Sequence, residues 1–303
     1  MKVFSKIRIF DKRTSLEDKI FDVVVLIVLA IVFILVAYPL YFVLIASLSE
    51  GSYINRGEVI LFPKGFTFES YSLVLRDPRI LTGYANTFIY TIFGTLLSVF
   101  VTVLAAFPLS RKDMFGHKFF TWFFLFTMYF NGGLIPTYLQ AKNLGLVNQR
   151  AAVIVIGCLS IWNLIVCRTF FVTNVPDELW EAASIDGCSM YKFFAVIVVP
   201  ISKTIVAIMV LYYAVGQWNG FWKAMIYLNR SALYPLQLVL RDILLGNQSL
   251  MLEGDPEAIA KAIEQGEVMK YAIIVVSSLP VLMFYPHIQK YFVKGVKVGS
   301  LKG

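Results

Sequence analysis

The sequence predicts an all-α polytopic membrane protein with six transmembrane helices and both termini in the cytoplasm. Of its 303 residues, 58% are hydrophobic and only 15% are charged, outside the usual range for soluble chains. About 20 apolar residues cross the bilayer hydrocarbon as a helix. Six buried helices of a soluble protein are the alternative, but soluble helices normally carry a charged stripe. Six windows without Asp, Glu, Lys or Arg lack that stripe: 23–48, 87–109, 119–139, 151–167, 204–222 and 271–289.

Residues 1–22 form a basic cytoplasmic segment before the first span. They could also lead into a signal peptide, but its apolar region spans only about 7–15 residues. No charged residue occurs between Asp22 and Glu50, so this window is interpreted as a membrane span. With the N-terminus inside, sixteen of the 27 Lys and Arg fall in cytoplasmic segments, as the positive-inside rule requires. This bias and anionic membrane lipid explain the net charge of +8, so no nucleic-acid partner is expected.

The remaining residues, 23–303, are expected to form one transmembrane domain with folded extracytoplasmic loops. Gly132, Gly133 and Pro136 mark turns or re-entrant backbone after the third span. The long outer loop 223–270 is expected to contain a short amphipathic helix after Pro256. The three cysteines form no CxxC pair and the two histidines are far apart, so no disulfide, metal site or catalytic site is expected.

The segment 174–200, before the fifth span, predicts a cytoplasmic helical hairpin. Pro176 suits a first helical position, and the two acidic residues after it favour the positive end of the helix dipole. Gly187 is the residue type that ends a helix in the left-handed conformation. We therefore expect about two and a half turns of helix, a sharp turn and a second helix leading into the fifth span. An interfacial helix lying among the lipid headgroups is the alternative. Three residues of the first helix are expected to share one face that permits close approach by another protein: Leu179, Ala182 and Ala183.

The hairpin resembles the EAA loop of ATP-binding-cassette importer permeases. Glu-Ala-Ala at 181–183 is followed by Gly187 and then by Ile197, Val199 and Pro200, where the consensus has Leu in place of Val199. In that family the loop is a coupling helix that docks in a groove on the cytoplasmic ATPase. The resemblance implies an ATPase-coupling role for seven residues: Glu181, Ala182, Ala183, Asp186, Gly187, Ile197 and Pro200.

The resemblance covers nearly the whole chain and is closest to carbohydrate permeases related to the maltose transporter, in the branch for oligosaccharides derived from complex polysaccharides. The segments 131–149, 200–228 and 289–303 carry it, while Thr204 stands where relatives commonly have Pro. It implies a bacterial cytoplasmic membrane protein that forms a heterodimer with a second permease. Two copies of a cytoplasmic ATPase, an extracytoplasmic binding protein and an oligosaccharide complete the implied partners. ATP and Mg would belong to the ATPase, and no cofactor is expected on this chain.

The C-terminal tail is a further candidate contact segment. The basic tail 290–303 is interrupted by glycines, which suits backbone threading into a crevice, and the resembled permeases place this tail between their ATPase subunits. A headgroup anchor is the alternative. Its expected contact residues are Gly299, Ser300, Leu301, Lys302 and Gly303.

Sugars are bound by aromatic faces and amide groups, which indicates a substrate pathway near the outer end of the fifth span. An interfacial aromatic belt is the alternative for the tryptophans, and a helix-to-helix hydrogen bond is the alternative for the asparagine of the fourth span. The pathway candidates are Asn163, Gln217, Trp218, Asn219 and Trp222.

An ion-coupled secondary transporter is the main functional alternative. Such carriers normally hold ionisable groups near the membrane midplane, whereas the six windows contain none except His287 near an inner end. A membrane-embedded enzyme is less favoured, because the sequence has no HExxH, GxSxG or intramembrane carboxylate cluster. It also has no GxxxxGK[ST] motif, so ATP-driven transport would require an ATPase on another chain.

Overall fold

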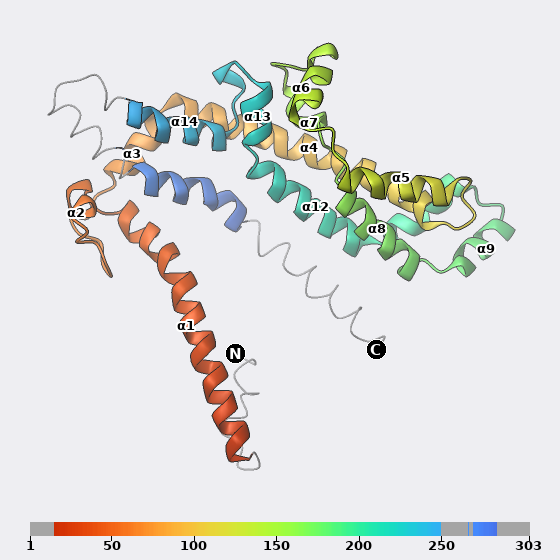
Figure 1. Ribbon diagram of the computed structural model, residues 1–303, viewed down its shortest axis with the longest axis horizontal. Coiled ribbons are helices and arrows are strands. Elements are labelled where there is room, and N and C mark those ends of the chain that lie inside the picture. Colours follow the sequence, from red (N-terminus) through yellow and green to blue (C-terminus); the bar gives the residue numbers. More distant parts are fainter. Residues whose placement is uncertain (1–14, 250–265, 267–268, 284–303) are drawn as a thin grey trace. The chain divides into compact units, whose positions relative to one another are not determined.

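The computed structural model describes residues 15–249, 266 and 269–283, and all regular structure in these residues is helical (Figure 1). The chain divides into two compact units, Met1–Val74 with Asn247–Val276 and Leu75–Gly246 with Ser277–Gly303. The helices are α1 (Leu16–Ser47), α2 (Gly51–Asn55), α3 (Glu69–Arg76), α4 (Pro78–Ser110), α5 (His117–Tyr129), α6 (Leu134–Asn143), α7 (Arg150–Val155), α8 (Ile161–Asn174), α9 (Asp177–Ile185), α10 (Met190–Phe193), the π-helix η3 (Phe194–Val198), α11 (Val199–Ile201), α12 (Lys203–Trp218), α13 (Trp222–Tyr227), the 3-10 helix η4 (Ser231–Leu233), α14 (Leu236–Ser249) and an apolar helix Met269–Met283.

The first unit is dominated by α1, a helix of 32 residues. It begins earlier than the expected span because the Ser15 hydroxyl caps it, accepting a hydrogen bond from Asp18 N at 3.1 Å. Its buried residues are confined to the last turn, and its most apolar stretch has no side chain buried within the protein. A helix that is apolar on all sides belongs in lipid or against another protein. The turn after α1 is fixed by Ser70, whose hydroxyl donates to Ser47 O at 2.8 Å.

The second unit is organised around α4, which packs along α8 and α12. The Asp77 carboxylate caps α4 by accepting from Arg79 N at 2.9 Å, and Pro78 occupies the first turn, where its missing N–H costs nothing. Because lipid is as apolar as a helix surface, close packing rather than water exclusion holds such helices together. The buried face of α4 supplies this close packing with residues spaced four apart: Tyr90, Gly94, Ser98, Thr102 and Ala106.

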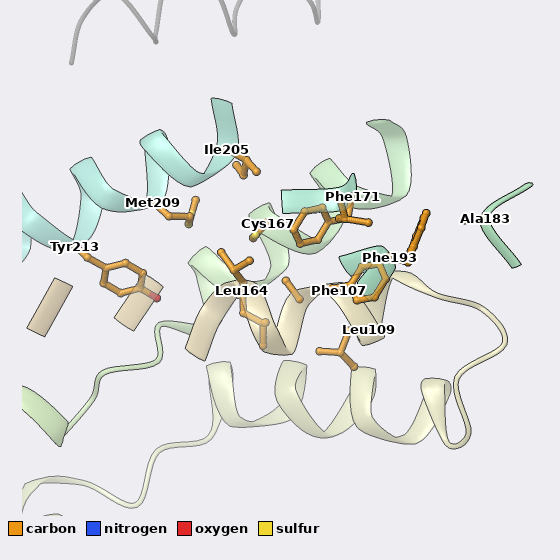
Figure 2. Packing of buried hydrophobic residues seen from close by; sticks show 13 residues of the cluster. Phe107, Leu109, Leu164, Cys167, Phe171, Ala183, Phe193, Ile205, Met209 and Tyr213 are labelled. Atoms are coloured by element: carbon orange, nitrogen blue, oxygen red, sulfur yellow. The ribbon is translucent and has the colours of Figure 1, made fainter. Parts of the chain in front are cut away.

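The core of this unit lies at the end of α4 nearest to α9 and α10. Figure 2 shows Phe107 among side chains from α8, α10 and α12. The Phe107 ring lies 6.2 Å from the Phe171 ring and 4.9 Å from the Phe194 ring. Two buried hydroxyl groups in this core bond to each other, since Thr102 Oγ1 and Tyr213 Oη are 2.6 Å apart, and Tyr213 Oη also accepts from Ser160 N at 3.2 Å. The core therefore joins α4, α8 and α12 to the hairpin.

The six expected spans correspond only in part to single helices. Within the described residues, α1 and α4 are long and apolar enough to cross a membrane, and Met190–Ile201 with Lys203–Trp218 make a third span if this pair, bent by 79°, is counted as one. The third and fourth windows are broken, with α5 and α6 separated near Gly133 and α7 and α8 separated near Gly157, two glycines of positive φ. The count of six spans and the location of the termini remain predictions. Residues 284–289 of the last window and the expected helix after Pro256 lie outside the described residues.

Candidate functional site

The hairpin between α8 and α12 has the predicted start, turn and second helix. Its first helix, α9, begins at Asp177, and Pro176 is the N-cap residue. The helix therefore starts one residue later than predicted, since Pro176 was expected at the first helical position. It ends in a Schellman motif: Gly187 has φ +73°, Gly187 N donates to Ser184 O at 3.0 Å, and Cys188 N donates to Ala183 O at 2.9 Å. The left-handed conformation predicted for this glycine is confirmed.

The two alanines of the Glu-Ala-Ala motif face opposite environments, contrary to the shared exposed face expected from the sequence. Ala183 is 8% exposed and packs in the core shown in Figure 2, while Ala182 is exposed. The difference arises because α10 folds back over α9 and brings the Phe193 ring to 5.2 Å from the Trp180 ring. Glu181 remains exposed beside Ala182. The outward face of the hairpin is therefore narrower than predicted.

Arg111, at the end of α4, ties the hairpin to the core of the second unit. Its guanidinium donates to both carboxylate oxygens of Asp113, at 3.1 and 3.2 Å, and to Asp177 of α9 at 3.2 Å. The same group lies 5.9 Å from the centre of the Trp180 ring, within cation–π range. The Arg111 side chain is 12% exposed, and its hydrogen bonds lower the pKa of Asp113 below the ordinary value. Arg111 therefore connects the first turn of α9, through Asp177 and Trp180, to the end of α4.

The second half of the hairpin is continuous with α12. Pro200 has no N–H to donate to Val196 O. The residues before Pro200 form the π-helix η3, in which the backbone hydrogen bonds span five residues, as from Val199 N to Phe194 O. Ser202 N is shared between Val198 O at 3.1 Å and Val199 O at 3.2 Å, at the 79° bend. Ile197 is partly buried against the core, and Asp186 is the exposed C-cap of α9. The hairpin is thus joined to α12 through a defined bend.

The pathway candidates separate into two groups. A cavity of about 410 Å³ at the C-terminal end of α12 is lined by residues that include Gln217, Asn219 and Trp222. Trp222 is 58% exposed, whereas Trp218 is 5% exposed and donates through Nε1 to Ser277 O at 3.2 Å. Trp218 therefore belongs to helix packing. The 8% exposed Asn163 lies in α8 and is not among the lining residues.

Several site residues could not be identified from the sequence. Lys223 and Tyr212 also line the cavity, and Gly94 makes room for the side chain of Gln217, because a Cβ there would lie 2.6 Å from Gln217 Nε2. Two of these carried signals: Lys223 is the charge that ends the fifth apolar window, and Gly94 belongs to a helix-spaced run of small residues. Arg111 likewise ends an apolar window, but its carboxylate partner in α9 is 66 residues away.

A polar cluster lies in the N-terminal part of α4. Asn86, 1% exposed in α4, donates through Nδ2 to Ala232 O at 2.8 Å and to Tyr234 O at 3.1 Å, and its Oδ1 accepts from Arg150 at 3.0 Å. Thr87 Oγ1 accepts from Leu236 N at 2.8 Å. These bonds hold the segment after α13 against α4, next to the elements that line the cavity. The tail residues Gly299, Ser300, Leu301, Lys302 and Gly303 lie outside the described residues.

Comparisons with known proteins identify full-length relatives. The chain is 37% identical to Protein LplC of Bacillus subtilis (strain 168) over 94% of this chain and 96% of the relative. It is 35% identical to the polygalacturonan/rhamnogalacturonan transport system permease protein YtcP of the same organism, over 95% and 100%. A solved bacterial ABC transporter involved in the import of the acidic polysaccharide alginate contains a chain that is 32% identical, with a TM-score of 0.84 over 92% of this chain and 99% of that one. No protein-family model matches the sequence.

Proposed function

The chain belongs to the permease family of ATP-binding-cassette carbohydrate importers, and from this membership we propose how it is built into its transporter. It is a non-catalytic membrane subunit that forms part of a translocation pathway and works with an ATPase, a second permease and a binding protein. We propose that it crosses the bacterial cytoplasmic membrane six times, with both termini in the cytoplasm. The two long apolar helices α1 and α4 and the distribution of Lys and Arg support this topology.

We further propose that the partner permease is a homologous but different chain, so that the pathway is lined by a heterodimer above two ATPase copies. ATP and Mg would be bound by the ATPase, with no cofactor on this chain. The apolar surface of α1 supports such a partner, because its most apolar stretch has no side chain buried by the described residues. The tail 290–303, with contact residues at 299–303, is proposed to reach the ATPase, as its basic and glycine-rich sequence suggests.

The proposed cargo is an oligosaccharide derived from a complex polysaccharide and delivered by the extracytoplasmic binding protein. The names of relatives support this class, since one is described as a polygalacturonan/rhamnogalacturonan permease and another as a melibiose/raffinose/stachyose permease. The cavity at the end of α12 offers an exposed indole and two amides, the groups that bind sugar rings and hydroxyls. We assign Gln217, Asn219 and Trp222 to the pathway, and Trp218 and Asn163 to helix packing.

The coupling site is proposed to be the outward face of the hairpin, with Glu181 and Ala182 against the ATPase. The observation that carries this proposal is the construction of the hairpin: one face is exposed and the other is locked to α4 and to the core. ATP-driven closure of the ATPase would move α9 and α10 as a unit, and the bend at Ser202 would transmit this movement to α12. Alternating access results if the ATPase states differ in affinity for the two permease conformations.

Substitution of the two adjacent alanines tests this coupling site. Ala182→Arg should remove the ATPase from the purified complex and abolish stimulated ATP hydrolysis, while the melting temperature of the permease stays unchanged, because Ala182 is exposed. Ala183→Arg should destabilise the permease itself, since a charge would replace an 8% exposed methyl group. Full binding-protein-stimulated hydrolysis in the Ala182→Arg complex would disprove docking at this face. Uptake that collapses with the proton gradient while ATP persists would instead support the ion-coupled alternative.

A further inference from the structure

The cavity at the C-terminal end of α12 contains a cation as well as aromatic and amide groups. Its volume is about 410 Å³, and Lys223, the second residue of α13, is among its lining residues. Tyr212 and Trp222 contribute aromatic surface, and Gln217 and Asn219 contribute amides. All of these residues belong to the second unit. The aromatic and amide groups of the cavity suit a sugar ring and its hydroxyls. The positive charge of Lys223 is not needed to bind a neutral sugar.

The Lys223 side chain lies close to the backbone at Gly157. Its Nζ lies 3.6 Å from the position that a Cβ on Gly157 would occupy, so the ammonium group is in van der Waals range of the backbone at this residue. Gly157 itself has φ +66°, a conformation that side chains rarely adopt, and it follows the short helix α7. The lysine side chain therefore lies over the break between α7 and α8 and does not extend freely into solvent.

The ammonium group of Lys223 has no carboxylate partner in the described part of the chain. The ion pairs there involve other residues, and the cavity lining contains neither Asp nor Glu. Lys223 is partly buried, and burial lowers its pKa below the ordinary value. A partly buried charge without a counter-ion is unfavourable, and an anion entering the cavity would relieve that cost.

We propose that this cavity binds an acidic sugar, with the carboxylate of a uronic acid residue against Lys223 and the sugar ring against Trp222. The inference rests on the proposed function, because it specifies the cargo of the same pathway. A uronate matches the cavity group by group: its ring face suits the indole, its hydroxyls suit Gln217 and Asn219, and its carboxylate suits the ammonium. An anionic lipid headgroup has the same charge but offers no sugar ring to the indole.

The test uses the complete importer in nanodiscs with its binding protein, and measures how ATP hydrolysis depends on digalacturonate concentration. Lys223→Gln should raise the half-maximal concentration about tenfold, the effect of losing one hydrogen bond to a charged group. Lys223→Arg should retain most of the response. Lys142→Gln is the matched control, because Lys142 is exposed on α6 and is not a lining residue. In the wild-type complex, the methyl diester of digalacturonate should stimulate hydrolysis less than the free acid, which provides a readout independent of any variant.

The outcomes separate this inference from the proposed function. If a neutral galactose oligosaccharide stimulates the wild-type and Lys223→Gln complexes equally, and digalacturonate does no better, the permease function stands and the acidic-sugar site is disproved. If no oligosaccharide stimulates the wild-type complex, the proposed function itself fails. A Lys223→Gln defect that appears only in phosphatidylglycerol nanodiscs, and is absent in phosphatidylcholine, would assign Lys223 to a lipid headgroup and would also overturn the inference.

Discussion

Gly187 allows the role of the hairpin to be separated from its stability. Gly187 has φ +73° with open space around the position of a missing Cβ, so Gly187→Ala introduces backbone strain without a clash. A left-handed residue other than glycine costs about 1–2 kcal/mol. Gly145, which ends α6, is a close match: its φ is +68°, the space around it is also open, and the same two Schellman bonds form, Gly145 N to Lys142 O at 3.0 Å and Leu146 N to Ala141 O at 2.9 Å.

We expect Gly187→Ala and Gly145→Ala to lower the melting temperature of the permease complex by similar amounts. Only Gly187→Ala should also reduce ATPase co-purification and stimulated ATP hydrolysis, because it shifts the end of α9 against the proposed docking groove. The assay compares both variants in nanodiscs, with thermal unfolding and hydrolysis measured on the same samples. Equal losses of hydrolysis in the two variants would show that Gly187 matters only for stability. Full hydrolysis in Gly187→Ala would refute the coupling role of the turn.

Two further predictions concern the same region. Arg111→Gln should lower the free energy of unfolding by only about 1 kcal/mol or less, because the carboxylate partners Asp113 and Asp177 are 59% and 71% exposed. It should nevertheless reduce stimulated ATP hydrolysis, because it releases α9 from α4. Unchanged hydrolysis would contradict the proposed transmission. In a chain that retains Cys188 as its only cysteine, an impermeant thiol reagent should label inverted membrane vesicles and not intact cells; labelling of intact cells would invert the topology.

The hairpin could be predicted from the sequence because its determinants are local. Acidic residues after Pro176 and a glycine ten residues later specify one short helix and its end, whatever surrounds them. The membrane class followed equally directly, because 58% hydrophobic residues in long uncharged windows leave no polar face for a soluble fold. The family resemblance rested on the same short-range spacing of Glu181, Gly187 and Pro200.

The side of each helix that is buried was decided by tertiary structure. Ala182 and Ala183 are adjacent residues of the same type, but only Ala183 is buried, because α10 folds back over that side of α9. Trp218 and Trp222 were equally good pathway candidates until the packing of α12 buried the first and left the second beside a cavity.

The charged partners were also decided by tertiary structure, since periodicity describes one helix at a time and carries no information about its neighbours. Arg111 meets Asp177 across 66 residues of chain, a pairing that no spacing rule predicts. Lys223 lies close to Gly157, 66 residues earlier in the chain, at the break between α7 and α8. The sequence alone predicted a helical membrane permease with a helical hairpin before the fifth expected span. Only the packing of α4, α8 and α12 determined which residues support the hairpin and which line the cavity, because burial and ion pairing depend on contacts between segments far apart in the chain.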